Sequence, residues 1–499
     1  MNLVRYLKIR TNNIAFLKIT GFGILIILGT LITGCKKLVE VDAPITNVNS
    51  ANIYNNDATA ASVLTGIYTN LSRDELVRGG LTGISLYAGV SSDEFEIISQ
   101  TQSSQNLRAY YLNNLNAQNA GVEFWNAIYS NLYVINAALE GVTNSTTLTP
   151  AVKQQILGEA KFMRAFYFFY LVNLYGDVPL VLSTNYKTNA LMSRTPKVQV
   201  WQQIVTDLKE AQNLLSSEYL DASLLKQTTE RVRPTKGAAT ALLARAYLYT
   251  KDWVNAEIQA TSILKSSHNT LVQLSDVFKK NNDEAIWQLQ PVDKGQNTKE
   301  ASTFIIIYDT DFDKPKLSKW LLNSFEAGDQ RQTQWVNSIV FNDVHYFYNY
   351  KYKAINLTGD LDFPVVEYST ILRLGEQYLI RAEARIQQQK IPEGINDLNI
   401  LRDRATDKVG GAVKLSMLRT SLTQKEALDA VLHERQIELF GEWGHRWLDL
   451  KRTEQVDNVM GTVLPEKINN GIWKSYLQLY PIPIYDIQKN PNLLQNQGY

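Results

Sequence analysis

The chain has 499 residues, of which 45% are hydrophobic, 20% charged and 10% aromatic, a composition that excludes a disordered or collagen-like protein. Fifty Lys and Arg residues stand against 49 Asp and Glu, so charge gives no support to nucleic-acid binding. One cysteine and four histidines are too few for a disulfide framework, a redox dithiol or a cysteine-based zinc site. We therefore expect no cofactor and no metal site of these kinds; a structural metal ion held by other ligands stays open.

The amino terminus has the organisation of an export signal. Residues 1–20 carry four positive charges and no acid, and an apolar run follows from 21 to 34. At about 1.5 Å per residue this run spans roughly 21 Å, less than the ~30 Å hydrocarbon core, which indicates a signal peptide rather than a membrane-spanning helix. The sequence LITGC, residues 31–35, resembles the lipobox of bacterial lipoproteins. The resemblance implies acylation of Cys35; a plain signal peptide with a chance cysteine is the alternative.

These features divide the chain into three predicted parts. Residues 1–34 are a lipoprotein signal peptide, and residues 35–56 are a lipid-anchored leash with little periodicity. Residues 57–499 form a helical body, within which residues 265–370 are irregular and contain short strands.

Apolar residues recur at three- and four-residue steps over most of this body, the spacing of amphipathic helices. The periodicity predicts helices over residues 57–70, 122–140, 151–175, 197–215 and 424–452. Gly176, with Pro179 just beyond it, is typical of a helix end.

Residues 233–264 resemble a tetratricopeptide helix pair, with Ala244 and Ala256 as small residues and Tyr247 as the aromatic that fills the gap. A weaker copy over residues 371–405 has Gly394 near a matching position. Such a pair buries its apolar face only by stacking on another, so we expect the pairs to pack into one larger body.

Three segments instead favour short strands, namely residues 285–291, 302–308 and 345–353. The third alternates strictly, which places four tyrosines on one face of a strand: Tyr346, Tyr348, Tyr350 and Tyr352. Residues 480–499 have the composition of a loop. The predicted fold class is mostly α.

Five segments, in order behind the lipobox, resemble the SusD/RagB family of outer-membrane nutrient-binding lipoproteins. They are residues 158–181, 233–249, 369–384, 433–453 and 479–499. The resemblance implies a body of tetratricopeptide-like helix pairs with a ligand face built from the intervening loops. It also implies a lipid anchor in the outer membrane facing the cell exterior, a SusC-like TonB-dependent transporter as partner, and an oligosaccharide or other nutrient as ligand.

Catalytic motifs are weak. His433-Glu434 begins like a zinc-protease helix, but Ile437 stands where the second histidine is required. We expect His445 to be a packed structural residue. A glycoside hydrolase needs only two carboxylates at a suitable separation, and no pair stands out. We expect a binding protein without enzymatic activity; a surface glycoside hydrolase and a protein-interaction scaffold are the alternatives.

A sugar ring stacks its C–H face on an aromatic ring, while its hydroxyls need amide, carboxylate or guanidinium groups close by. Most aromatics at helical spacing are expected in the core, and so is Trp287. Two regions outside that scaffold combine aromatic and polar residues, 99–116 and 308–352. The candidate ligand-binding residues are Asp93, Tyr110, Tyr111, Asn113, Tyr308, Trp320 and Tyr346.

Overall fold

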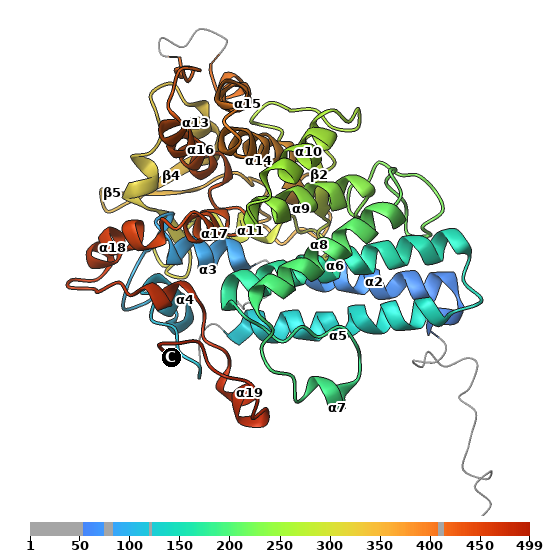
Figure 1. The fold of residues 1–499 in the computed structure, drawn as a ribbon. Helices are drawn as coiled ribbons and strands as arrows, with labels where there is room; N and C mark the ends of the chain where they lie inside the picture. Colours follow the sequence, from blue (N-terminus) through green and yellow to red (C-terminus); the bar gives the residue numbers. More distant parts are fainter. Residues whose placement is uncertain (1–52, 74–82, 119–121, 408–413) are drawn as a thin grey trace, which may run out of the picture. The chain divides into compact units, whose positions relative to one another are not determined.

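The computed structural model describes residues 53–73, 83–118, 122–407 and 414–499 (Figure 1). Helices dominate and the strands are short, so the predicted mostly α fold is confirmed. Cys35, the predicted signal peptide and most of the predicted leash lie outside the described residues. In the described ranges, every helix is too short or too polar to cross a bilayer.

Four long helices lie side by side: α2 (Asp57–Arg73), α5 (Val122–Asn144), α6 (Pro150–Tyr175) and α8 (Lys197–Leu214) (Figure 1). Helix α6 contacts the other three. Proline suits its first turn because the amide hydrogen there has no helical acceptor. The helix ends at Gly176, whose φ of +74° favours glycine, as the sequence predicts.

The helix pairs expected from the tetratricopeptide pattern are present. The first pair is α9 (Lys236–Tyr249) with α10 (Trp253–Leu264), and the second is α14 (Leu374–Gln387) with α15 (Ile391–Arg404). Helix α10 packs on α14, so the two pairs share one body. A Cβ atom on Gly394 would lie 2.5 Å from Ile386 Cγ1, so glycine is required for the close approach of α14 and α15.

Helix α9 begins at a buried cap. The Thr235 hydroxyl accepts the Ala238 amide hydrogen across 3.3 Å. Replacing Thr235 by Ala leaves that buried donor unsatisfied and is expected to lower the free energy of unfolding by about 1–2 kcal/mol. Urea denaturation measures the change, with Gln332→Ala on the exposed side of α13 (Gln330–Trp335) as the control. Equal midpoints for the two variants would contradict the role of this cap.

Within the ranges that the structure describes, the strands form three two-stranded antiparallel sheets. They pair β1 (Phe95–Ile97) with β3 (Pro315–Leu317), β2 (Ala285–Leu289) with β6 (Ser369–Arg373), and β4 (Val336–Phe341) with β5 (Val344–Asn349). Strand β2 confirms the strand expected over residues 285–291.

Three local predictions need correction. The strand expected at 302–308 is wrong, because the Thr298 hydroxyl caps a short helix, α11 (Lys299–Phe304). The strand expected at 345–353 ends at Asn349, because its partner strand β4 begins only at Val336, directly after helix α13. The helix expected over 424–452 is two helices, α16 (Gln424–Leu439) and α17 (His445–Arg452), separated by residues with positive φ.

The remaining helices are short or lie outside the predicted segments. They are α3 (Ile84–Ser91), α4 (Gln105–Tyr111), α7 (Tyr186–Asn189), α12 (Lys319–Leu322), α18 (Val456–Lys467), α19 (Ile484–Lys489) and the 3₁₀ turns η2 (Ile53–Asn55) and η4 (Ser475–Gln478). Helix α19 falls within the segment expected to be a loop.

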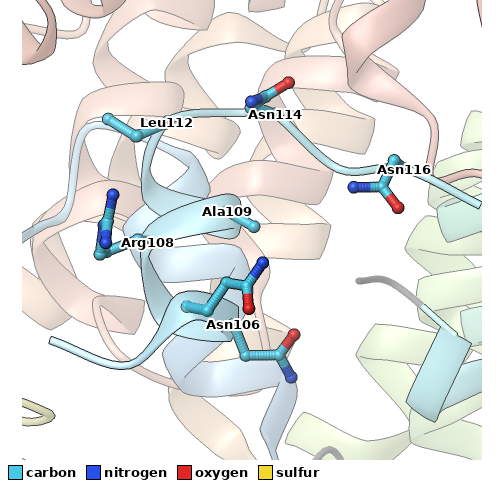
Figure 2. Close-up of a pocket in the computed structure, with 7 residues that line it drawn as sticks. Asn106, Arg108, Ala109, Leu112, Asn114 and Asn116 are labelled. Atoms are coloured by element: carbon cyan, nitrogen blue, oxygen red, sulfur yellow. The ribbon is translucent and has the colours of Figure 1, made fainter. Parts of the chain in front are cut away.

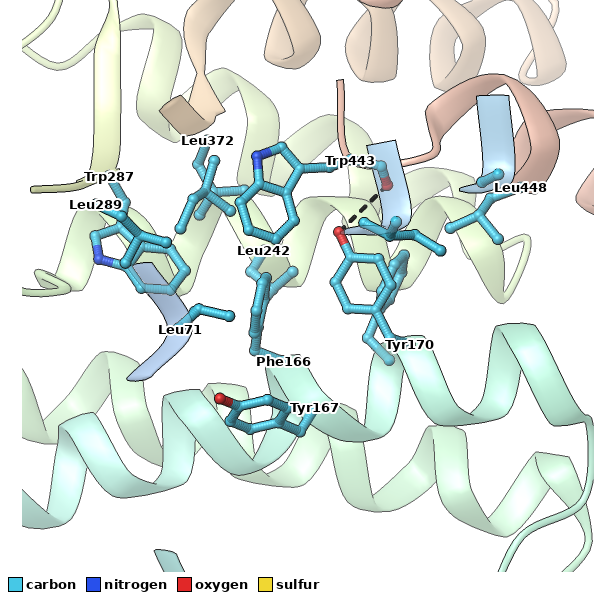
Figure 3. Close-up of a cluster of buried hydrophobic side chains, with 14 of the residues drawn as sticks. Leu71, Phe166, Tyr167, Tyr170, Leu242, Trp287, Leu289, Leu372, Trp443 and Leu448 are labelled. Carbon is cyan, nitrogen blue, oxygen red and sulfur yellow. Dashed lines mark hydrogen bonds between the residues drawn. The ribbon is translucent and has the colours of Figure 1, made fainter. Parts of the chain in front are cut away.

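Aromatic side chains fill the interior (Figure 3). Trp287 is fully buried; the rings of Phe162 and Phe166 meet it edge-on, with centroids 4.9 and 5.3 Å away. Its indole N–H donates to the Val232 carbonyl across 3.0 Å, which satisfies its polar atom. The aromatics expected in the core are Trp125, Tyr129, Phe162, Phe166, Trp287, Trp443 and Trp447. Burial confirms this role for all of them except Tyr129, which is only partly buried and packs against the core.

A buried ionic network lies beside this aromatic core. Glu434, Glu438 and Glu442 recur every fourth residue along and just after α16, and all three are buried. They pair with arginines from other elements, notably Arg331 and Arg373. The carboxylates that follow His433, on and just after α16, are therefore used in ion pairs. Within the described ranges, no group of three or more His, Cys, Asp or Glu side chains could hold a metal ion.

Candidate ligand-binding site

The fold brings together the two regions expected to bind ligand. Strand β1 precedes the first region and pairs with β3 in the second, with Phe95 opposite Leu317 and Ile97 opposite Pro315. The Ser103 hydroxyl donates to the Phe312 carbonyl, and the Ser104 amide donates to Asp313 Oδ1 across 2.6 Å. These contacts fix the start of α4 on the segment that follows Tyr308.

Helix α4 has an apolar and a polar side. Ser104 caps it by accepting the Leu107 amide hydrogen. Leu107, Tyr110 and Tyr111 stand at i, i+3 and i+4, and all three are buried. The helical period therefore directs the two tyrosines inward and leaves polar residues on the outer side.

The polar side of α4 borders a cavity of about 410 Å³ (Figure 2). Its lining comes from α4 and the segment after it: Gln105, Asn106, Arg108, Ala109, Leu112, Asn114 and Asn116. We call it the α4 cavity. Four amides and one guanidinium supply both donors and acceptors, whereas no aromatic ring and no carboxylate lines it. This chemistry suits a hydroxyl-bearing ligand.

Two side chains of the lining have contrasting partners. Asn106 donates to Glu123 Oε1, which holds its amide in place. Arg108 has no carboxylate within ion-pair distance among the described residues, and its buried Nε has no hydrogen-bond acceptor. Arg108 therefore retains unused hydrogen-bonding capacity at the cavity.

Three of the predicted site residues are buried and occupied by interior contacts. The ring of Tyr110 stacks on Tyr87 with centroids 4.3 Å apart. Asn113 donates to the Ser91 carbonyl across 3.1 Å. Asp93 forms a bidentate pair with Arg446 at 2.7 and 2.8 Å. Burial opposes ionisation of this carboxyl, but Arg446 outweighs it and lowers the pKa of Asp93. We leave these three residues out of the proposed site.

Tyr111 and Trp320 each pack beside a lysine. Tyr111 is buried with Lys467 Nζ 4.8 Å from its ring centroid, and Trp320 is half-buried with Lys319 Nζ 5.1 Å from its ring. Each ring therefore has a cation over it. Of the two, Trp320 retains the larger exposed surface.

Tyr308 and Tyr346 differ in exposure. Tyr308 is 61% exposed, and its backbone is fixed because Asp311 Oδ2 accepts the amide hydrogens of Ile307 and Tyr308. Tyr346 is half-buried against Phe341 on the β4–β5 hairpin, with centroids 5.9 Å apart. Tyr308 is thus the predicted aromatic most available for stacking.

The α4 cavity lies within the predicted segment 99–116, on the polar side of α4 and not on the side of Tyr110 and Tyr111. Gln105, Asn106 and Asn116 were not singled out, although they stand within residues 99–116. The signal that identifies them is the helical period itself, because a helix over 105–111 with Leu107 inward places Gln105 and Arg108 outward.

Lys467 gives this region a measurable pH response. Its Nζ donates to the Val90 and Ser92 carbonyls, both at 2.6 Å, and burial lowers the pKa of Lys467 to about 7. The unfolded chain keeps the ordinary value near 10.4, so between these pH values it binds a proton that the folded chain lacks. The contribution of Lys467 to the free energy of unfolding therefore rises as the pH increases from about 7 to about 10.

Lys467→Met is expected to reduce that rise in the free energy of unfolding by roughly 1 kcal/mol per pH unit. Urea titrations at pH 7 and 9 measure it, with wild type as the reference that retains every other titrating group. Equal pH slopes for the two proteins would show that Lys467 keeps an ordinary pKa.

Comparison with known families gives two separate matches, one on each side of residues 249–345. A family model described as "Starch-binding associating with outer membrane" matches residues 47–248. A second, described as "SusD family", matches residues 346–499. The α4 cavity falls within the first match.

Individual relatives extend over nearly the whole chain. SusD-like protein P25 of Formosa agariphila is 24% identical, over 93% of this chain and 96% of its own length. Among solved structures, a SusD-like protein from Bacteroides fragilis superposes with a TM-score of 0.73 at 20% identity, covering 92% of this chain and all of that chain. A structure titled "Laminarin binding SusD-like protein" gives 0.69 at 20% identity, covering 89% of this chain and all of its own. The two structural likenesses show a common fold.

Proposed function

Because the chain belongs to the SusD/RagB family, we propose that it is a cell-surface protein that captures oligosaccharides for a SusC-like TonB-dependent transporter in the outer membrane. The observation that carries the ligand class is the α4 cavity, with its amide lining and the unpaired Arg108. It binds by shape and hydrogen bonds and needs no cofactor and no catalysis.

The lining matches the surface chemistry of a sugar. Each hydroxyl donates one hydrogen bond and accepts others, which amide side chains can provide in both directions. Leu112 and Ala109 add a small apolar surface for the C–H groups of the ring. The exposed ring of Tyr308, on the segment fixed to α4, would stack on a further sugar unit.

The remaining parts of the proposal come from the sequence and the family. Cys35 is the proposed site of lipid attachment, and residues 36–56 would tether the body to the membrane. Two or more acyl chains provide stable anchoring, since each buried methylene contributes about 0.8 kcal/mol. The transporter partner follows from the family resemblance.

Calorimetric titration of residues 36–499 tests the capture role, with laminarihexaose, maltohexaose, xylohexaose and mannohexaose as probes. We expect saturable binding of at least one probe and no increase in reducing sugar after prolonged incubation. A rise in reducing sugar would replace the capture role with a glycoside hydrolase. Absence of binding to every probe would overturn the oligosaccharide ligand.

A further inference from the structure

Two large hollows in the described part of the chain lie away from the α4 cavity, at the ends of the long helices. One, of about 1070 Å³, lies between the carboxyl ends of α6, α9 and α17 and the first turns of α8. Its neighbour, of about 870 Å³, is bordered by α14, α16 and the start of α18. The two share Lys251, Arg452 and Glu454, so they meet along one line. We call the pair the helix-end groove.

An ion pair crosses the line where the two hollows meet. Lys251 Nζ lies 3.1 Å from Glu454 Oε1, and the two side chains are 60% and 79% exposed. Both residues stand in tight turns with positive φ, at +59° and +61°. An exposed pair of this kind contributes little to stability, so separating it joins the two hollows at small cost.

The groove combines aromatic rings with amide side chains. Trp201 is half-buried, with its ring edge-on to Phe169 at 5.6 Å and tilted on Tyr249 at 5.8 Å. Its indole N–H donates to no protein atom recorded among the described residues and is not shielded from solvent. Gln202, next to it on α8, is exposed. A ring face, a free donor and an amide in one place are the groups that bind a sugar.

Other occupants fit this groove less well. Its cationic and acidic side chains are nearly equal in number, which does not favour nucleic acid. Its walls are helices, whose backbone groups are already hydrogen-bonded, so a peptide strand finds no edge to pair with. Several aliphatic lining residues are buried, such as Val172, Leu248 and Val431. Among the described residues of the lining, Val198 is the one strongly exposed aliphatic member, which is too small an apolar surface to hold an amphipathic helix.

We propose that the helix-end groove is a second oligosaccharide-binding site, in which a chain of several sugars spans both hollows beneath or in place of the Lys251–Glu454 pair. The ligand class rests on the proposed function, whereas the site is separate from the α4 cavity. A long glycan held at two places on one molecule dissociates more slowly than from either site alone.

Single-cysteine reporters test the two sites independently. Residues 36–499 contain no cysteine, because Cys35 is the only one in the chain. Gln202→Cys reports on the groove and Gln105→Cys on the α4 cavity, each labelled with an environment-sensitive fluorophore. Gln199→Cys is the matched control, since Gln199 is an exposed glutamine of α8 that lines neither site. The probes are the four hexaoses named above.

We expect saturable emission changes at positions 202 and 105 and none at 199. Thr206→Trp, a bulky replacement at an exposed groove residue, should weaken the response at 202 at least tenfold and leave that at 105 unchanged. A response at 105 alone overturns the groove proposal and preserves the proposed function. A response at 202 alone supports the groove and removes the α4 cavity, and silence at both overturns both sites.

Discussion

Replacing Arg373 by Met is expected to lower the free energy of unfolding by roughly 3–5 kcal/mol, the largest single-residue effect we anticipate. The guanidinium is 2% exposed and meets three buried carboxylates. Nη1 lies 2.9 Å from Glu284 and 2.7 Å from Glu438, and Nε lies 2.8 Å from Glu442. Removing the arginine leaves these charges less compensated in a medium of low polarity, and methionine supplies no donor.

The pKa values of the network support this direction. Burial opposes ionisation of Glu438, but Arg404, Arg373 and Arg331 outweigh it and hold the pKa of Glu438 well below its ordinary value. Urea denaturation at pH 7 measures the loss, with Arg419→Met, at an exposed arginine, as the matched control. A loss below 1 kcal/mol would mean that the network relaxes around the missing charge.

The second large effect concerns ligand affinity. Replacing both Arg108 and Asn114 by Ala removes the unpaired guanidinium and an exposed amide from the α4 cavity. A charge-assisted hydrogen bond contributes about 1.5–3 kcal/mol and a neutral one about 0.5–1.5, so the affinity for the bound oligosaccharide should fall at least tenfold. Calorimetry measures the change in Kd.

The matched control for that variant is Arg419→Ala with Gln199→Ala, which removes one arginine and one amide from exposed positions away from the cavity. Both double variants should retain the wild-type urea midpoint, because three of the four side chains are exposed and the half-buried Arg108 forms no ion pair among the described residues. Unchanged affinity in the Arg108/Asn114 variant would remove the α4 cavity as the site.

Most of the helical framework could be predicted from the sequence, since its helices are long and their apolar residues recur with a clear period. Helix α6 is the best example, because its aromatic residues and Gly176 mark both its buried surface and its end. The short segments were harder. Residues 302–308 have a strand-like composition, but a single threonine cap determines that the first part is helical.

The side chains that line the candidate site could be predicted only in part, because their exposure depends on elements of seven residues or fewer. In α4 the sequence favours Tyr110 and Tyr111 as ligand contacts. Both tyrosines instead fill the interior, and the neighbouring amide side chains remain outside. The ionic network could not be predicted at all. Arg373 and Glu284 stand 89 residues apart, and nothing local to either indicates the pairing.

The proposed function depends most on where an oligosaccharide binds. The most direct measurement is a crystal structure of residues 36–499 with the hexaose that binds in calorimetry. We expect density for a sugar ring in the α4 cavity, with hydroxyls within hydrogen-bond distance of Arg108, Asn114 and Asn116. Sugar density confined to other surfaces, with the α4 cavity holding only solvent, would contradict the central claim.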